Sequence, residues 1–144
     1  MTQLETFRRL IAGELDSPPV AHLVGMRMVA AEPGRVTFEL DAGPQHASPL
    51  GTLHGGILCD LADAAMGCAH ASLLVEGESF TTLELKINFL KPVWTGRLTA
   101  VGSVIKAGRT VGLVACDVTD EDGSLVAHAT STCLTLRGSM AEGR

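Results

Sequence analysis

The stretch PLGTLHGGILCDLADAAMG, residues 49–67, determines how this chain folds and where its chemistry is expected. A His-Gly-Gly triplet, His54 to Gly56, comes just before a run of helical composition that contains two aspartates, Asp60 and Asp63. Glycine is a poor helix former, and an acid inside an apolar helix is costly to bury. The combination therefore predicts a helix whose start and middle do more than fill a core.

A long helix is predicted over Leu53–Val75, because its apolar residues recur at helical spacing and few of them are β-branched. Its expected buried stripe consists of Ile57, Leu61, Ala64, Ala65, Cys68 and Ser72. Most of these side chains are small, so we expect a sheet or a second helix to approach the helix backbone closely.

Strands are predicted on both sides of this helix. A short amphipathic helix at Gln3–Gly13, within an N-terminal segment of residues 1–16, precedes them. The predicted strands are His22–Ala31, Arg35–Leu40, Phe80–Leu90, Gly96–Lys106, Arg109–Asp117 and Leu125–Leu136. This order predicts an α+β domain with antiparallel strands and with helices on one face of the sheet. We expect one domain over residues 1–144, in which residues 138–144 form a flexible tail.

The composition of the chain argues against several classes of protein, namely nucleic-acid-binding, membrane-spanning and metal-binding proteins. The 144 residues are 46% hydrophobic with a formal net charge of −5, so a sizeable core is expected and a basic footprint for nucleic acid is not. The chain has no signal-peptide pattern and no apolar run of the roughly 20 residues that a membrane helix requires, which favours a cytoplasmic protein. The four cysteines lack metal-ligand spacing, and Cys59, Cys68 and Cys133 are expected to be buried free thiols. We predict no metal site.

Gly55 and Gly56, at the predicted helix start, offer backbone amides that have no partner within the helix. The helix dipole adds partial positive charge there, and the missing Cβ lets a substrate carbonyl approach. The pair is therefore typical of an anion or oxyanion site. The same doublet is equally typical of a tight junction between a loop and a helix, and the doublet alone leaves both interpretations open.

Asp63 has small, apolar sequence neighbours, so its carboxylate is either satisfied by polar partners from elsewhere or held ready for chemistry. Asp60 is interpreted as an ordinary exposed acid. Gly55 and Asp63 are eight residues apart, about 12 Å along a helix, whereas a reacting carbonyl carbon must lie about 3 Å from both groups. If the two residues share a site, they therefore come from two chains related by a two-fold axis.

Four stretches together resemble the hotdog-fold acyl-CoA thioesterases, in the phenylacetate-degradation branch that is related to 4-hydroxybenzoyl-CoA thioesterase. They are SPLGTLHGGILCDLADAAMGCA, TTLELKINFLKPVWTGRLTA, AGRTVGLVACDV and DGSLVAHATSTCL, within residues 22–136. The resemblance implies a long central helix wrapped by a curved antiparallel sheet of about five to six strands. It also implies a homodimer with one continuous sheet and shared active sites, paired again into a homotetramer.

The resemblance also implies roles for particular residues. The Gly55 amide polarises the thioester carbonyl of an acyl-CoA, and Asp63 of the partner chain is the nucleophile or the general base for water. His54 shapes the loop and contacts the thioester, and the Thr82 hydroxyl holds the attacking water. Ser48 stands where many relatives carry Asn or Gln, and its single hydroxyl donor is expected to affect rate and substrate preference.

Three further residues are predicted to bind substrate. Gly56 lies beside the oxyanion site, and Arg109 is a candidate for the CoA phosphates. Glu84 is expected to share one strand face with Thr82, because the two are separated by one residue. Since CoA is part of the substrate, no separate cofactor is expected.

The favoured function is hydrolysis of an aryl- or medium-chain acyl-CoA. One alternative is a non-catalytic acyl-CoA-binding module, although such a module would have no need of the acid at Asp63. A second alternative is a dehydratase acting on acyl thioesters, which relies on a catalytic histidine in other motif surroundings. The histidines other than His54 are scattered over different elements and are predicted not to be catalytic.

Overall fold

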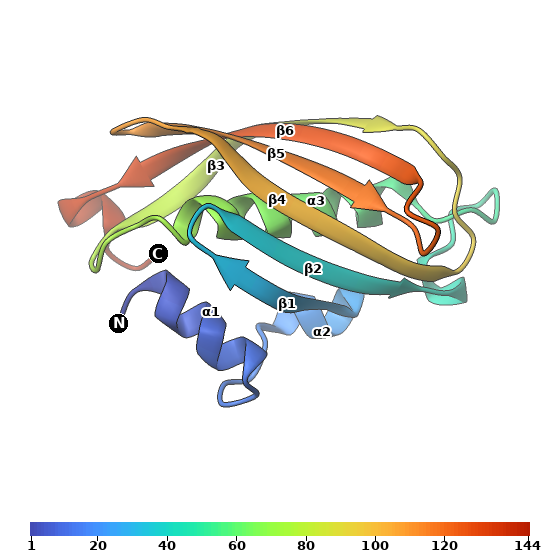
Figure 1. Cartoon of the computed structure of the whole chain (residues 1–144), viewed down its shortest axis with the longest axis horizontal. Coiled ribbons are helices and arrows are strands. Elements are labelled where there is room, and N and C mark those ends of the chain that lie inside the picture. Colours follow the sequence, from blue (N-terminus) through green and yellow to red (C-terminus); the bar gives the residue numbers. More distant parts are fainter.

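One long helix lies against a single six-stranded sheet in the computed structural model, which describes residues 1–144 (Figure 1). The helices are α1 (Gln3–Ile11), α2 (Pro19–Val24) and α3 (Gly55–Ala71), with two 3-10 turns at Pro44–His46 and Gly138–Ala141. The strands are β1 (Met26–Glu32), β2 (Arg35–Ala42), β3 (Ser79–Phe89), β4 (Gly96–Ala107), β5 (Val111–Thr119) and β6 (Leu125–Leu136). Every strand pair is antiparallel, and the curved sheet wraps α3. The predicted α+β hotdog fold is confirmed.

The sheet has two edges, since its strand order is β1-β2-β4-β5-β6-β3. β3 pairs only with β6, so the N–H and C=O groups along its other side have no partner strand. Leu83 and Phe89 on β3 are 55% and 56% exposed. An edge strand that carries exposed apolar side chains is a template for pairing with a second chain.

The concave face of the sheet packs on α3 with very little space between the backbones. Ala62, Ala65 and Ala69 of α3 have no exposed surface. A Cβ added to Gly102 of β4 would overlap the backbone carbonyl of Ala65, so only glycine fits at this crossing. The small residues along α3 thus allow the close approach that the sequence predicts.

One strand boundary was predicted wrongly, because His22–Val24 end helix α2 instead of beginning the first strand. Pro19 occupies the first position of α2, where its fixed φ favours a helix and its missing N–H costs nothing. Gly25 ends the helix in the left-handed conformation, with φ of 88°. The chain enters β1 only at Met26.

α3 is also shorter than the predicted span of Leu53–Val75. At its start, the Leu53 amide donates to the carbonyl of Val93 at 2.7 Å and belongs to the preceding loop. At its end, the Ser72 hydroxyl donates to the carbonyl of Ala69 at 2.6 Å and accepts from the Gly34 amide at 2.8 Å. Ser72 thus ties the end of α3 to the β1–β2 turn.

The two ends of the chain, the four cysteines and the lengths of the helices were also predicted from the sequence. The N-terminal helix ends at Ile11, inside the predicted segment, and the C-terminal residues contain one exposed 3-10 turn at Gly138–Ala141. All four cysteines are free; Cys116 and Cys133 are buried, whereas Cys59 and Cys68 are half-buried. None of the helices is long and apolar enough to cross a bilayer.

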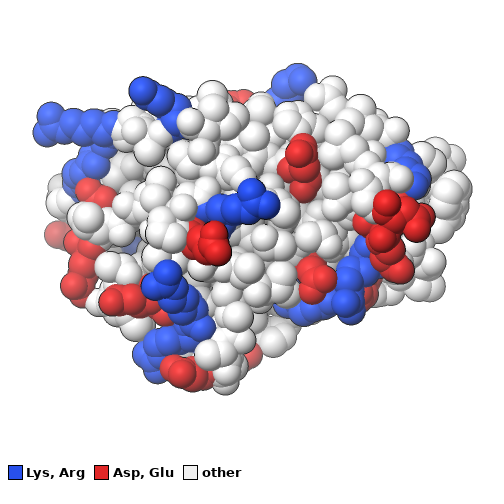
Figure 2. Space-filling view, in the orientation of Figure 1, with Lys and Arg blue, Asp and Glu red and all other residues white.

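Basic and acidic side chains lie next to one another on the face drawn in Figure 2. The ion pairs of the chain include Arg27 with Asp41, Arg97 with Asp41, and Lys91 with Asp120. These pairs tie neighbouring strands and turns together at the surface. Their cations are therefore already engaged by carboxylates of the same chain.

Candidate active site

The loop that leads into α3 is held by one buried histidine. His46 is 5% exposed; its Nε2 donates to the carbonyl of Val24 at 2.7 Å, and its Nδ1 accepts from the Gly43 amide at 3.1 Å. The His46 carbonyl in turn accepts from the His54 amide at 2.9 Å. These bonds anchor residues 43–54 to the end of α2, so the start of α3 has a fixed position. No pattern in the sequence indicates this anchoring role of His46.

His54 caps the helix and leaves one amide without a partner. Its Nδ1 accepts a hydrogen bond from the Gly56 amide at 3.0 Å, and its carbonyl accepts from the Ile57 amide. The Gly55 amide makes no hydrogen bond within the chain. Gly55 is therefore the first donor that the positive end of the helix dipole offers to a ligand. The amide of Gly56, a residue predicted to bind substrate, already donates its hydrogen bond to His54.

His54 itself is exposed, and its hydrogen bond fixes the position of its proton. Because Nδ1 accepts from Gly56, the neutral imidazole carries its hydrogen on Nε2. The side chain of this residue, which directly precedes Gly55 in the chain, thus has an N–H donor at Nε2. Two donors at one helix start can stabilise a single developing negative charge.

Ser48 contributes to the loop rather than to the acid. Its hydroxyl accepts from the Leu50 amide at 3.2 Å and lies 3.4 Å from the Thr52 hydroxyl. Its amide donates to the Thr52 carbonyl at 2.7 Å. Within one chain, these contacts close the turn before His54 and do not reach Asp63.

Asp63 lies in the middle of α3, at the surface of a single protomer. The atoms around its carboxyl partly desolvate it and raise its pKa, and the negative charge of Asp60 raises it further. The nearby Thr82 hydroxyl acts in the opposite direction and lowers the pKa. A carboxylate that is partly desolvated and held by one hydroxyl is typical of a group that accepts protons during a reaction.

A β-bulge separates Thr82 from Glu84, contrary to the expectation that the two share a face. Thr82 pairs with Cys133 and Glu84 with Thr132, so Leu83 is an extra residue on β3. The bulge shifts the alternation by one position, and Glu84 lies exposed on the side away from α3. Glu84 was therefore assigned to the wrong face of the strand, because simple alternation does not reveal a bulge.

Gly55 and Asp63 do not meet within one chain. They lie on the same continuous helix, about 12 Å apart along its axis. Phe89 at the end of β3 covers the helix start, since a Cβ added to Gly55 would lie 2.9 Å from its ring. Phe89 could not be recognised from the sequence as a neighbour of the site, because contacts between β3 and α3 depend on the sheet order.

Arg109 lies far from the start of α3 in the same chain. It is exposed in the turn between β4 and β5, where its carbonyl accepts from the Arg137 guanidinium at 2.6 Å. Gly112, three residues later, packs against His70 near the other end of α3. The structure therefore separates Arg109 from Gly55 by most of the length of the helix.

The described residues include no group of three or more His, Cys, Asp or Glu side chains placed to hold a metal ion together. The titratable side chains of α3 itself are those of Cys59, Asp60, Asp63, Cys68 and His70. Burial raises the pKa of Cys68 to about 12, so this thiol is neutral at physiological pH. The arrangement thus offers one partly desolvated carboxylate, the free Gly55 amide and the Nε2–H of His54 as its chemical groups.

Comparison with known proteins agrees with this geometry. The model of the thioesterase superfamily matches residues 50–127, more than half of the chain, including the start of α3 and all of β3. The chain belongs to the thioesterase superfamily. This thioesterase is 30% identical over 108 residues to human acyl-coenzyme A thioesterase 13, a match that covers 73% of the chain and 76% of the human protein.

Solved structures agree as well. A thioesterase family protein from Silicibacter pomeroyi has 30% identity and a TM-score of 0.80, over 92% of this chain and 99% of that one. The PaaI protein of the phenylacetic acid degradation operon of E. coli has a TM-score of 0.82 over 95% and 98% of the two chains; at 21% identity it supports the fold alone. The thioesterase thus has the hotdog fold and is a thioester hydrolase.

Proposed function

We propose that this thioesterase hydrolyses an aryl- or medium-chain acyl-CoA to the free acid and CoA in two shared sites of a homodimer. In each site, the Gly55 amide of one protomer stabilises the oxyanion and Asp63 of the other acts on the carbonyl carbon. The acyl-CoA class is supported by the human relative, whose name is acyl-coenzyme A thioesterase 13. The finer assignment rests on the residues of α3.

One observation carries the proposal: the free Gly55 amide and the partly desolvated Asp63 lie on one helix but too far apart to act on one carbonyl. A two-fold axis brings the start of one α3 beside the middle of another when the helices run antiparallel. The unpaired edge of β3, with Leu83 and Phe89 exposed, supports such an axis, because two β3 strands can pair there. Thr82 on β3 then lies close to both helices.

Two chemical routes are consistent with this site. In the first, Asp63 takes a proton from a water molecule while the water oxygen bonds to the thioester carbon. The oxyanion that forms accepts hydrogen bonds from the Gly55 amide and from Nε2 of His54. Collapse of the intermediate breaks the C–S bond, and the departing thiolate receives the proton that Asp63 had taken.

In the second route, the Asp63 carboxylate bonds directly to the thioester carbon and expels the thiolate. The resulting anhydride is then hydrolysed by water, which restores the carboxylate and releases the acid. Thr82 holds the Asp63 carboxylate in either route and orients the water. A thioester is already activated for acyl transfer, so one carboxylate and preorganised donors are sufficient for the reaction.

The oligomeric state, the cellular location and the cofactor requirement of the protein belong to the same proposal. We propose that the dimers pair again into a homotetramer, that the protein is cytoplasmic and that it needs no cofactor besides its CoA-containing substrate. The exposed Val111 and Leu113 on β5 support further association, because they add apolar surface away from the β3 edge. Light scattering coupled to gel filtration measures the assembly directly.

The decisive experiment replaces Asp63 by Asn, which keeps the shape of the side chain and removes the base. We expect kcat for a panel of aryl-, short- and medium-chain acyl-CoA esters to fall about 10²- to 10⁴-fold, with an unchanged melting temperature. Thiol release, detected with a thiol reagent, gives the rate. Near-normal activity of Asp63→Asn would assign the base to another residue, and binding without turnover by the natural protein would favour an acyl-CoA-binding module.

A hybrid dimer tests whether the site is shared. Asp63→Asn chains mixed with Gly55→Pro chains form one intact site per hybrid, from Gly55 of the first chain and Asp63 of the second. We expect activity to return in hybrids isolated with two different affinity tags. Hybrids that stay inactive, although both chains are present and folded, would contradict the shared site.

A further inference from the structure

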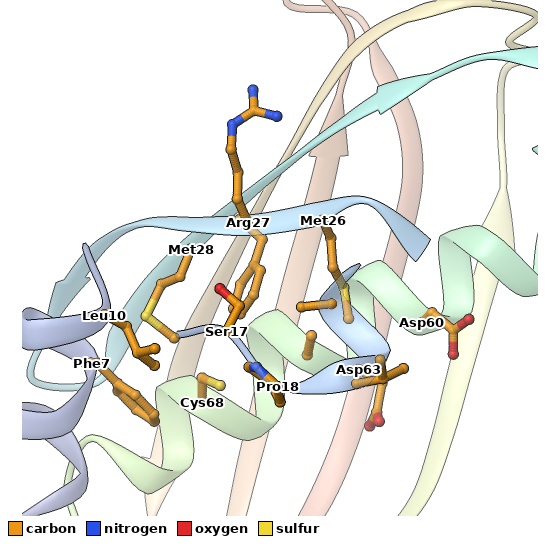
Figure 3. A pocket seen from close by; sticks show the side chains of 14 residues that line it. Phe7, Leu10, Ser17, Pro18, Met26, Arg27, Met28, Asp60, Asp63 and Cys68 are labelled. Carbon is orange, nitrogen blue, oxygen red and sulfur yellow. The ribbon is translucent and has the colours of Figure 1, made fainter. Parts of the chain in front are cut away.

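A cavity of about 390 Å³ lies beside Asp63, between α3, β1 and the two N-terminal helices (Figure 3). Nine of its 14 lining residues are hydrophobic. Figure 3 shows Asp60 and Asp63 at one end of the lining side chains, and Phe7, Leu10 and Cys68 at the other. The cavity therefore runs from an acidic mouth to an apolar end.

The apolar end is built by the N-terminal helix. Phe7 of α1 is buried in a small cluster with Ala71 and Leu74, separate from the main core. Leu10 and Cys68 pack against the same cluster. α1 therefore closes a space that the sheet and α3 alone would leave open, and the segment before β1 sets the length of the cavity.

The charges around the cavity select against an anionic occupant. Two carboxylates, Asp60 and Asp63, line its mouth. Arg27, its one cationic lining residue, points away from the other side chains in Figure 3, and its guanidinium donates to Asp41 at 3.1 Å and to Glu39 at 3.4 Å. No unpaired cation is thus available inside to hold a carboxylate, whereas a neutral apolar group meets matching walls.

Resting on the proposed function, we infer that the acyl group occupies the cavity of the same protomer that supplies Asp63, and not that of the protomer that supplies Gly55. The reason is geometric. The acyl chain begins at the carbonyl carbon on which Asp63 acts, so its first carbons lie within a few bond lengths of that carboxylate. Asp63 itself lines this mostly apolar cavity, so the cavity begins beside the reacting carbon.

The volume then limits the acyl group. At the roughly 30 Å³ that one water molecule occupies in the liquid, 390 Å³ holds about a dozen non-hydrogen atoms. An octanoyl or a phenylacetyl group fits in that space, and a palmitoyl group does not. The inferred substrates are thus neutral, compact acyl groups, and acyl groups that end in a carboxylate are excluded.

The first test fills the apolar end. Leu10→Trp places an indole in the cavity, and Ile11→Trp is the matched control, since Ile11 is the next residue of α1 and does not line the cavity. We expect Leu10→Trp to lower the ratio of kcat/KM for octanoyl-CoA to that for butyryl-CoA by about tenfold or more, and Ile11→Trp to leave it unchanged. Cys68→Met is a second variant, which adds volume at the same end of the cavity from α3. Because it leaves α1 unchanged, it shows whether an effect of Leu10→Trp arises only from displacement of α1 by the indole.

The second test assigns the cavity to one protomer. In the hybrid of Asp63→Asn and Gly55→Pro chains, the competent site uses Asp63 of the Gly55→Pro chain. Leu10→Trp added to that chain is expected to lower the octanoyl-to-butyryl ratio, whereas the same change in the Asp63→Asn chain leaves it unaltered. The reverse pattern would place the acyl group in the other protomer and overturn the inference.

The possible failures are distinguishable. If the natural protein hydrolyses none of the esters, the proposed function fails and the inference falls with it. If it hydrolyses them and neither Leu10→Trp nor Cys68→Met changes the ratio, the inference alone is overturned. Hydrolysis of palmitoyl- or succinyl-CoA as fast as octanoyl-CoA would overturn the size and charge limits.

Discussion

The two ends of α3 use similar residues for opposite purposes. At the start, His54 is exposed, its imidazole accepts one amide, and the next glycine keeps its amide free for a ligand. Near the end, His70 is 3% exposed, its Nε2 lies 3.0 Å from the Thr135 hydroxyl, and its ring packs on Gly112 of β5. A histidine beside a glycine thus leaves one amide without a partner at the start of α3, whereas near the end it packs against the sheet.

The difference arises from the sheet and not from the helix. β4 and β5 cross the second half of α3 and leave no space for side chains at Gly102 and Gly112. At the first residue of α3, a Cβ added to Gly55 would instead meet only the side-chain ring of Phe89. We therefore expect substitutions at the start to change rates and those near the end to change stability.

The largest expected effect is at the start. Gly55→Pro removes the amide N–H but keeps the helix, because Pro is favoured at the first helical position and His54 before it is already extended, with ψ of 132°. We expect kcat to fall about 10²- to 10³-fold. Gly55→Ala keeps the amide, and its Cβ meets only the tip of the Phe89 ring, so its loss should be smaller. Equal losses in both variants would show that the amide is not the oxyanion donor.

Gly102→Ala tests the close contact between β4 and the second half of α3. The new Cβ would overlap the carbonyl of Ala65, so strand and helix must move apart, at a cost of about 3 kcal/mol, the upper part of the usual range for overpacking. Urea unfolding followed by circular dichroism measures this loss, and the half-buried neighbour Ser103, changed to Ala, is the control. A loss of under about 0.5 kcal/mol, as at ordinary surface sites, would contradict the close crossing.

Much of the fold can be predicted from the sequence, because the hydrophobic patterns of the helix and of the strands differ clearly. The alanine-rich helix and the alternating strands have strong periods, and the structure has the helix and all six strands near their predicted positions. The segment at His22–Val24 was missed because two prolines and one glycine determine it locally against a strand-like composition. Proline and glycine can thus override the structure that the hydrophobic pattern predicts, but only within a segment of a few residues.

The site was less predictable, because its geometry depends on contacts between distant segments. Gly55 could be singled out from the helix start alone, since unpaired amides at a helix start are a local property, whereas His54 was singled out only by the family resemblance. Glu84 was placed on the wrong face because a bulge depends on the partner strand. The cavity behind Asp63 was not anticipated, since it forms only when α1 docks beside β1 and α3.

A smaller effect concerns His70. Burial lowers the pKa of this imidazole, an effect that the negative charge of Glu78 partly offsets, and its buried Nδ1 has no hydrogen-bond partner. The unfolded chain therefore takes up the proton first as pH falls below about 6.5, and the stability that His70 contributes above that pH is lost. We expect the urea midpoint to fall more steeply from pH 7.5 to 5.5 in the natural protein than in His70→Gln, which can still bond Thr135. Parallel curves would assign the pH dependence to other groups.

The smallest expected effect is a shift in pH dependence at Thr82, which joins the middle of α3 to the edge strand. Its hydroxyl lowers the pKa of Asp63 against the effect of burial, so Thr82→Val should let that pKa rise. Since Asp63 must be ionised to act, the acidic limb of kcat/KM then moves to higher pH, while Thr82→Ser keeps it in place. The rate on the plateau separates two roles: it stays near normal if Thr82 only holds the acid, and it falls if Thr82 also holds the attacking water. An unmoved limb in Thr82→Val would mean that the hydroxyl does not control the acid, and the middle of α3 would then act without help from β3.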